Sequence, residues 1–227
     1  APGSVPAAAP GSVPAAAPAA GPSSPSLWQA GFQDTILLHR GQLQTMAHYI
    51  ADNPRRLAAK RANPELFTVA SRQPACPGLA CPVIGNRFLL GHPLKHQIQV
   101  SRRIAAEGLA AKREELLHAA RHGTVLVSPC ISPGEKKIAR AAMDAGFPLI
   151  VLLENGFPPL YKPPGRYFDA CAAGRLLMIA PFPYHRRRQT ITRDQCLTLN
   201  QYAQTIAETA PAGSVSAAAP AGSVSAA

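Results

Sequence analysis

Three short runs of apolar residues in the second half of the chain predict strands that are buried on both faces. They are Thr124–Val127, Pro148–Leu153 and Leu176–Ala180, and none of them alternates apolar with polar side chains. Continuous apolar strands are typical of a parallel sheet with helices on both sides, because neither face of such a sheet meets water. The pattern therefore predicts an α/β fold.

Helix signals separate these strands. Ser132-Pro133-Gly134-Glu135 has the form of a capping box with proline at the first helical position, and Gly146 ends the helix that it opens. A second capping box, Thr192–Gln195, precedes a helix whose inward face holds Leu199, Tyr202, Ala203 and Ile206. Ile104–Arg121 also has helical periodicity. Strands that alternate with helices predict a Rossmann-like parallel sheet with flanking helices.

The sequence pattern in the first half of the chain predicts a small helical appendage. In Gln42–Ala51 the apolar residues recur at helical spacing, at Leu43, Met46, Ala47 and Ile50. Asn53-Pro54 is expected to end this helix and cap a second one, because the residue before proline avoids the helical conformation. Asn63-Pro64 is expected to do the same. Arg87–Leu90 and Gln97–Ser101 are predicted as strands, the latter from its alternation.

Composition divides the chain further. Residues 1–26 and 210–227 contain only Ala, Gly, Pro, Ser and Val, too little apolar surface to offset the entropy of ordering. Both are expected to be disordered tails of low complexity. Residues 27–75 form the predicted helical segment, and residues 76–209 the Rossmann-like domain.

The net charge indicates an anionic partner. The chain has 23 Lys and Arg against 12 Asp and Glu, a net charge of +11 and a pI near 10.0. The excess is spread along the chain, which favours a basic surface over a basic tail. No apolar run reaches the length of a membrane span, so no membrane partner is expected. Five unevenly spaced cysteines without a signal peptide predict free thiols in the cytoplasm.

One pattern of cysteines and histidines could suggest a metal site. Cys76, Cys81, His92 and His96 invite a zinc-finger interpretation, but Pro93 interrupts the required helical turn and the gap between Cys and His is short. A proline-rich loop that leads into strands is the preferred interpretation, so no zinc is predicted. Glycine-rich nucleotide-binding motifs are also missing from the sequence.

The stretch WQAGFQDTILLHRGQLQTMAHYIADNPRRLAAKRANPELF resembles the end of the transposase domain of REP-associated, IS200-like tyrosine transposases. It carries Trp-x-x-Gly-Phe-x-Asp and then Tyr-Ile-x-x-Asn-Pro. The resemblance implies that Tyr49 is the nucleophile that attacks a DNA phosphodiester. Those enzymes bind a divalent metal with a His-x-His strand, and none of the seven histidines here forms that triplet. Tyr49 is therefore expected to be inert in this chain.

A second resemblance covers more than half of the chain. QVSRR, GTVLVSPCISPGEKKIARAAMDAGFPLIVLL, GFPPLYKPPGRYFDAC and LLMIAPFPYHRRRQTITRDQCLTLNQYA are together similar to the DNA-processing protein A (DprA/Smf) family. The resemblance implies a Rossmann-like fold that binds single-stranded DNA. It also brings Ser101 and Arg102, in QVSRR, into the predicted DNA-binding set. The glycine-rich turn of that family is replaced here by Ser132-Pro133-Gly134-Glu135.

Strand order places further residues in the same predicted site. Ligands of an open parallel sheet lie outside the carboxyl ends of its strands. Ser132 and Gly134 follow one such strand at a helix N-terminus, which favours phosphate, and Lys136 and Lys137 lie in the first turn. Solvated lysines on an exposed helix face are the alternative. The loop after the third strand contains Tyr184, Arg186, Arg187 and Arg188. An aromatic residue beside cations is typical of proteins that bind single strands. A solvated loop is the alternative.

The sequence thus predicts a cytoplasmic DNA-binding protein, with single-stranded DNA as the partner, in a context of transposition or DNA recombination. Cleavage of DNA and a bound cofactor are not expected from this chain. The alternative is an active tyrosine transposase that uses a divalent metal bound upstream or in a partner. A small-molecule-binding α/β module is the second alternative. Whether the chain is an enzyme and whether it forms a homodimer stay open.

Overall fold

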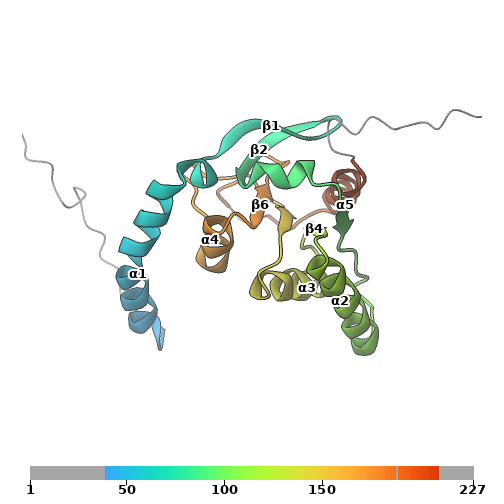
Figure 1. Cartoon of the computed structure of the whole chain (residues 1–227), viewed down its shortest axis with the longest axis horizontal. Coiled ribbons are helices and arrows are strands. Elements are labelled where there is room, and N and C mark those ends of the chain that lie inside the picture. The colour runs from blue at the N-terminus through green and yellow to red at the C-terminus, as the bar shows by residue number, and fades with distance from the viewer. Residues whose placement is uncertain (1–38, 188, 210–227) are drawn as a thin grey trace, which may run out of the picture. The chain divides into compact units, whose positions relative to one another are not determined.

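The computed structural model describes residues 39–187 and 189–209 (Figure 1). The predicted tails lie outside these residues. By their contacts, the described residues up to Ile50 belong to one unit and those from Ala51 onward to a second, so the two are described separately. The elements in chain order are α1 (Gln42–Ala62), η1 (Pro64–Phe67), β1 (Ala70–Cys76), β2 (Leu79–Gly85), η2 (Arg87–Gly91), β3 (Lys95–Gln97), α2 (Ala106–Arg121), β4 (Val125–Ser128), α3 (Pro133–Asp144), β5 (Leu149–Leu152), α4 (Gly165–Ala172), β6 (Leu176–Ile179) and α5 (Arg193–Glu208), where η marks a 3₁₀ helix.

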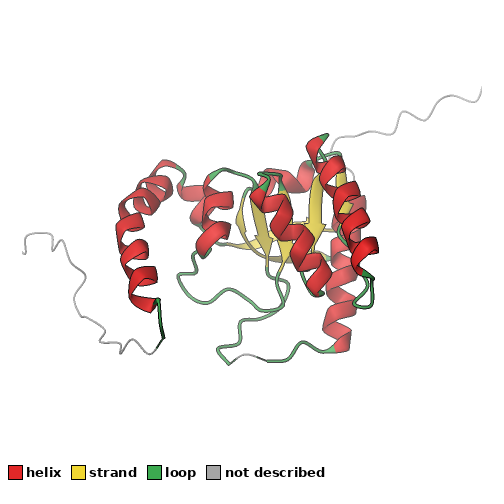
Figure 2. Ribbon diagram, turned by 90° about the horizontal axis from the view of Figure 1, so that it is seen from below, coloured by secondary structure: helices red, strands yellow, loops and turns green. Residues whose placement is uncertain are grey.

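One mixed sheet of six strands organises the second unit, in the order β1-β2-β6-β5-β4-β3. Figure 2 shows strands of this sheet in yellow, with helices in front of them. Strands β3, β4, β5 and β6 are parallel, whereas β2 pairs antiparallel with both β1 and β6. Leu149 of β5 pairs with Leu126 of β4 on one side and with Leu176 of β6 on the other. The prediction of an α/β fold with a mostly parallel sheet and flanking helices is confirmed.

Side chains of the three central strands enter two hydrophobic clusters on opposite faces of the sheet, which explains why their sequences do not alternate. Helices α2, α3 and α4 cover one face and lie below the strands in Figure 1, and α5 covers the other, where it shares a hydrophobic cluster with side chains of β1 and β2. Leu126, Leu149, Val151, Leu176 and Met178 belong to the first cluster. Val125, Val127, Ile150, Leu152, Leu177 and Ile179 belong to the second.

Both predicted capping boxes are present. The Oγ atom of Ser132 accepts a hydrogen bond from the backbone N–H of Glu135, and the Glu135 side chain accepts from the backbone N–H of Ser132. Thr192 and Gln195 make the corresponding pair at the start of α5. These local hydrogen bonds determine the residue at which each helix begins, so the start of both helices can be predicted from the sequence alone.

The predicted break at Asn53-Pro54 is wrong, because α1 continues through Pro54 to Ala62. Proline removes one helical hydrogen bond, but side-chain pairs span the position. The Nη2 atom of Arg55 donates to Oδ2 of Asp52 at 2.9 Å, and Arg56 also pairs with Asp52. The apolar face predicted for the first turns does not become a buried one: Leu43 is 67% and Ile50 63% exposed.

A β-hairpin replaces the proline-rich loop predicted around Cys76 and Cys81. Strands β1 and β2 meet at a tight turn of Pro77 and Gly78, whose φ of +78° suits glycine. Pro74 is tolerated because β1 is an edge strand, where one side of the backbone has no partner strand in the sheet. Strand β1 also crosses the predicted boundary between residues 75 and 76.

Both strands predicted between residues 87 and 101 differ from the structure. Arg87–Gly91 is the 3₁₀ helix η2, because the side chain of Asn86 caps it by accepting from the backbone N–H of Phe88 at 3.0 Å. Strand β3 covers Lys95–Gln97 and overlaps the prediction only at Gln97. The pairing of β3 with β4 runs from Lys95 to Gln97, and the N–H of Ile98 then donates to the carbonyl of Val127 at 2.7 Å before the chain leaves the sheet.

No helix among residues 39–187 and 189–209 is long and apolar enough to cross a membrane. All five cysteines are free thiols, and Cys76, Cys81 and Cys171 are buried.

Candidate functional site at the carboxyl edge of the sheet

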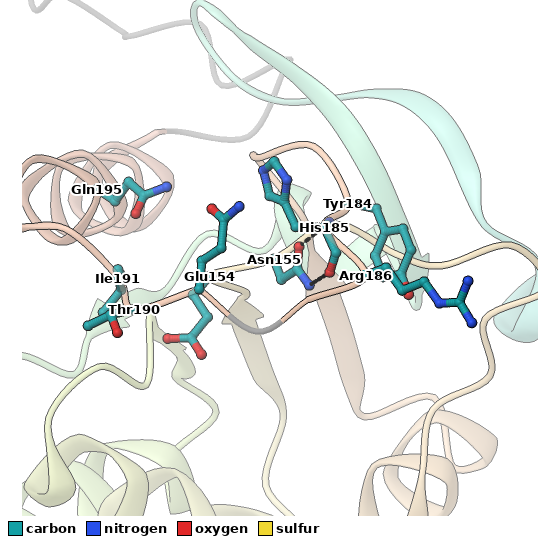
Figure 3. Close-up of a pocket in the computed structure, with 9 residues that line it drawn as sticks. Glu154, Asn155, Tyr184, His185, Arg186, Thr190, Ile191 and Gln195 are labelled. Carbon is teal, nitrogen blue, oxygen red and sulfur yellow. Dashed lines mark hydrogen bonds between the residues drawn. The ribbon is translucent and has the colours of Figure 1, made fainter.

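Two cavities lie at the carboxyl ends of the parallel strands. The first, of about 250 Å³, is called the Arg186 cavity; the second, of about 770 Å³, is called the Arg102 cavity. The first is lined by Glu154, Asn155, Tyr184, His185, Arg186, Gln189, Thr190, Ile191 and Gln195 (Figure 3). The second is lined by Gln99, Val100, Ser101, Arg102, Ile131, Ser132, Glu135, Ile191, Arg193, Cys196, Leu197 and Asn200. Ile191 belongs to both, so the cavities adjoin.

The structure brings half of the predicted DNA-binding residues to these two cavities. Tyr184 and Arg186 line the first, and Ser101, Arg102 and Ser132 line the second. They come from loops after β6, β3 and β4, as expected for the carboxyl edge of a parallel sheet.

The remaining predicted residues lie elsewhere. Lys136 and Lys137 are exposed in the first turn of α3 but line neither cavity, and Arg187 is exposed in the loop beside the Arg186 cavity. Arg188 lies outside the described residues. Gly134 is buried, and a Cβ atom there would come within 2.7 Å of the Val100 side chain. Close packing therefore accounts for this glycine.

The N-terminus of α3 does not offer the open phosphate site that the sequence suggested. The Glu135 carboxylate is buried, and its Oε2 accepts from the backbone N–H of Ile131 at 2.8 Å and of Ser132 at 3.2 Å. The N–H of Glu135 is bonded to Ser132 Oγ. A buried carboxylate of the chain thus occupies the position predicted for an anion, and it would repel a phosphate there. Ser132 and Gly134 act in capping and packing.

A clamp that the sequence analysis missed fixes the loop after β6. The side chain of Asn155 donates through Nδ2 to the carbonyl of His185 at 3.0 Å, and its Oδ1 accepts from the N–H of His185 at 2.8 Å (Figure 3). Next to it, the N–H of Gly156 donates to the carbonyl of Pro183 at 3.2 Å. A Cβ atom at Gly156 would lie 2.4 Å from the backbone nitrogen of Tyr184. The Asn-Gly pair, which follows the buried strand β5 after two residues, was the available signal in the sequence.

This clamp holds the backbone between the two predicted contact residues. Tyr184 and Arg186 flank His185, both are exposed, and Figure 3 shows them on the same stretch of loop. An aromatic ring and a guanidinium are therefore presented together from a fixed backbone. Across the two cavities the cationic side chains are Arg102, Arg186 and Arg193; the acidic ones are Glu154 and the internally bonded Glu135.

Cys130 lies at the junction of β4 and α3 but is not an activated nucleophile. Its φ of +50° is unusual for a residue with a side chain, and its backbone N–H donates to Ser128 Oγ at 3.0 Å. Burial raises the pKa of the Cys130 thiol to about 11. The thiol is therefore protonated at neutral pH, whereas nucleophilic attack needs the thiolate.

Tyr49, the nucleophile that the transposase resemblance implies, lies on α1 in the first unit and is 58% exposed. The cysteines and histidines of the zinc-finger pattern lie in the second unit. Cys76 lies on β1 and His96 on β3, the two edge strands of the sheet. Within the part of the chain that the structure describes, no three His, Cys, Asp or Glu side chains are grouped so that they could hold a metal ion.

Comparison with known proteins finds no matching family model, no similar curated protein and no similar solved structure.

Proposed function

We propose that this chain binds single-stranded DNA along the carboxyl edge of its parallel sheet. The observation that carries the proposal is the clamped loop, in which Tyr184 and Arg186 are presented next to a cavity at that edge. Aromatic rings that stack bases beside cations that neutralise phosphates are the usual means of binding single strands. A net charge of +11 adds a favourable, salt-dependent attraction to any polyanion.

The phosphate path in this proposal runs between the two cavities. Arg186 and Arg187 contact phosphates at the loop, and Arg102 contacts phosphates at the adjoining cavity. Lys136 and Lys137 extend the basic surface from the first turn of α3. Tyr184 is 42% exposed, which leaves part of its ring accessible to a base. A cytoplasmic location and a role in transposition or DNA recombination belong to the same proposal.

The salt dependence of binding tests this path. Removing two phosphate contacts by the double substitution Arg186→Ala and Arg187→Ala should flatten the log–log salt slope for a single-stranded oligonucleotide by about 1.4, since each contact contributes roughly 0.7. The matched control, Arg113→Ala with Arg121→Ala, removes the same charge from exposed positions on α2. It should change the slope much less. Equal slopes for the loop variant and the wild type would remove the loop from the site.

A tyrosine transposase is the alternative, favoured by the exposure of Tyr49. It requires a divalent metal that another segment or a partner supplies, because a tyrosine hydroxyl is a weak nucleophile and needs a polarised phosphate to attack. Incubation with hairpin DNA and Mg²⁺ should give no covalent adduct on a denaturing gel. An adduct that disappears in Tyr49→Phe would establish the transposase reaction.

A small-molecule-binding module is the second alternative. The Arg102 cavity, at about 770 Å³, is in the size range of ligand sites. Absence of binding to both single-stranded and duplex oligonucleotides at physiological salt would favour this alternative over a DNA-binding site.

A further inference from the structure

A third hollow, of about 620 Å³, lies on the other side of Tyr184 and is here called the Leu160 hollow. Most of its lining comes from the loop between β5 and α4, and the rest from the segment before β1, from the strands β1 and β2, and from the loop after β6. The lining residues are Thr68, Val69, Ser71, Pro82, Phe157, Pro158, Pro159, Leu160, Tyr161, Lys162 and Tyr184. Rings and aliphatic side chains predominate, in contrast to the polar Arg186 cavity.

Leu160 is held in a conformation that its side chain does not favour. Its φ is +58°, in the left-handed region, and 93% of its surface is exposed. Residues with bulky side chains rarely adopt this conformation. An exposed leucine side chain also contributes none of the free energy that its burial would provide. Strained residues of this kind gather at ligand contacts, where the surrounding structure holds them.

The neighbours of Leu160 show what holds it. The N–H of Tyr161 donates to the carbonyl of Pro158 at 3.2 Å, and the Tyr161 ring lies 4.8 Å from the Phe157 ring. Burial raises the pKa of Tyr161 to about 12, and its hydroxyl reaches Met178 of β6. Tyr161 thus anchors the loop inward while Leu160 stands outward at the rim.

The chemistry of the hollow suits an uncharged planar group better than a phosphate. The one cationic side chain of its lining, Lys162, donates through Nζ to the carbonyl of Phe67 at 2.9 Å. The other side chains offer ring faces, proline rings and aliphatic surface, which favour contact with a flat aromatic ligand. Tyr184 lines both this hollow and the Arg186 cavity. A ligand that extends over Tyr184 would therefore contact cations in the Arg186 cavity and apolar surface in the Leu160 hollow.

We propose that the Leu160 hollow receives one unpaired base of the bound single strand, between Tyr184 and Leu160, while the adjacent phosphates lie at Arg186 and Arg187. This inference rests on the proposed function and adds to it a subsite for bases that is separate from the phosphate contacts. Leu160 and the prolines pack against the base, which explains why the loop keeps an exposed leucine. Duplex DNA is excluded from this subsite because its bases are paired and stacked.

The test compares two oligonucleotides of equal length and charge by fluorescence anisotropy, one of thymidines and one with an abasic spacer at each position. The wild type should bind the thymidine oligonucleotide roughly tenfold more tightly, since stacking one base contributes about 1 to 3 kcal/mol. Leu160→Gly, which accepts the positive φ, should reduce this ratio to threefold or less with an unchanged salt slope. The matched control Leu94→Gly removes another exposed leucine, away from the hollow, and should keep the ratio.

The double substitution Arg186→Ala and Arg187→Ala should flatten the salt slope and keep the ratio, which separates the two kinds of contact. Equal affinity of the wild type for the two oligonucleotides would overturn the base subsite and base stacking at Tyr184, and would leave only the phosphate contacts of the proposed function standing. A ratio that survives in Leu160→Gly would also overturn it. If neither oligonucleotide binds at low salt, the proposed function fails and the subsite fails with it.

Discussion

Glu135 illustrates how a single side chain can appear functional in the sequence and serve structure in the fold. Its carboxylate accepts from two backbone N–H groups, and it is only 3% exposed. Buried charge is tolerated when it is hydrogen-bonded in this way, and the N-terminus of a helix favours an anion. The same position that suggested phosphate binding is therefore satisfied from within.

Glu135→Ala should lower the free energy of unfolding by about 1 to 3 kcal/mol, because it leaves the N–H groups of Ile131 and Ser132 without their acceptor. Glu135→Gln keeps an acceptor oxygen and should cost less. Urea denaturation measures both values. The exposed Glu114→Ala on α2 is the control and should stay within about 0.5 kcal/mol of the wild type. Equal effects of Glu135→Ala and Glu114→Ala would contradict the capping role.

The buried thiols predict a loss of stability at alkaline pH. Burial raises the pKa of Cys81 to about 11 and that of Cys171 to about 12, well above the ordinary value near 9. Between pH 9 and pH 11 the unfolded chain has lost these protons and the folded chain keeps them, so the folded state binds more protons and stability falls as pH rises. Below pH 9 both states are protonated, and the contribution is fully present.

Urea denaturation of the reduced protein at several pH values should show this decline, on the order of 1 to 2 kcal/mol for each thiol. Cys81→Ala removes one titrating group and should make the decline between pH 9 and pH 11 shallower, whatever its effect at neutral pH. A decline of the same steepness in Cys81→Ala would show that its thiol does not contribute.

At the scale of elements, α1 and the β1–β2 hairpin show that proline marks a break only when nothing opposes it. In α1, the pairs from Asp52 to Arg55 and Arg56 bridge Pro54 on the helix surface. In the hairpin, Pro74 lies on an edge strand and Pro77 in the turn, positions that require no N–H for the sheet. The asparagine-proline and proline-rich patterns therefore gave wrong boundaries in both places.

Pro54→Ala tests whether α1 is continuous. Alanine restores the missing helical hydrogen bond and is about 3 kcal/mol more favourable than proline in a helix interior. Amide hydrogen exchange of residues 51–58 should slow by at least about fivefold, which corresponds to roughly 1 kcal/mol. Unchanged exchange at these residues would indicate two separate helices, as the sequence pattern suggested. Pro77→Ala, in the hairpin turn, provides a substitution that should leave this exchange unaffected.

At the scale of the whole molecule, the proposed binding of an anionic partner rests on the net charge of +11 and on the parallel part of the sheet. The loops after β3, β4, β5 and β6 meet along one edge because the four strands are parallel, although they are far apart in the sequence. The positive charge destabilises the compact state by self-repulsion, and a bound polyanion relieves that repulsion.

Single-stranded DNA should therefore raise the melting temperature. At a free oligonucleotide concentration of 100 times Kd, linkage predicts about 2.7 kcal/mol of added stability, measurable by differential scanning fluorimetry at low salt. The shift should shrink as salt is added, because binding weakens steeply with ionic strength. A duplex of the same length should give a smaller shift. Absence of any shift with either DNA would count against the proposed function.

Local signals determined the helices that begin with a capping box and the strands buried on both faces. Ser132 with Glu135, and Thr192 with Gln195, act within four residues, so no tertiary contact is needed to place α3 and α5. Strands β4, β5 and β6 were predictable because burial on two faces leaves a continuous apolar run. These elements imply a parallel sheet, and a parallel sheet implies the edge at which Tyr184 and Arg186 lie.

The strands β1 and β3 and the long-range contacts of the site were decided only by the tertiary structure. Lys95–Gln97 becomes a strand because β4 offers it a partner, and Ala70–Cys76 becomes an edge strand because β2 pairs with β6. The clamp from Asn155 to His185 joins residues thirty positions apart, and the Leu160 hollow joins Val69 to Tyr184. Such contacts depend on which segments become neighbours in the sheet. The packing of the whole chain determines this, and the residue pattern of a single segment does not predict it.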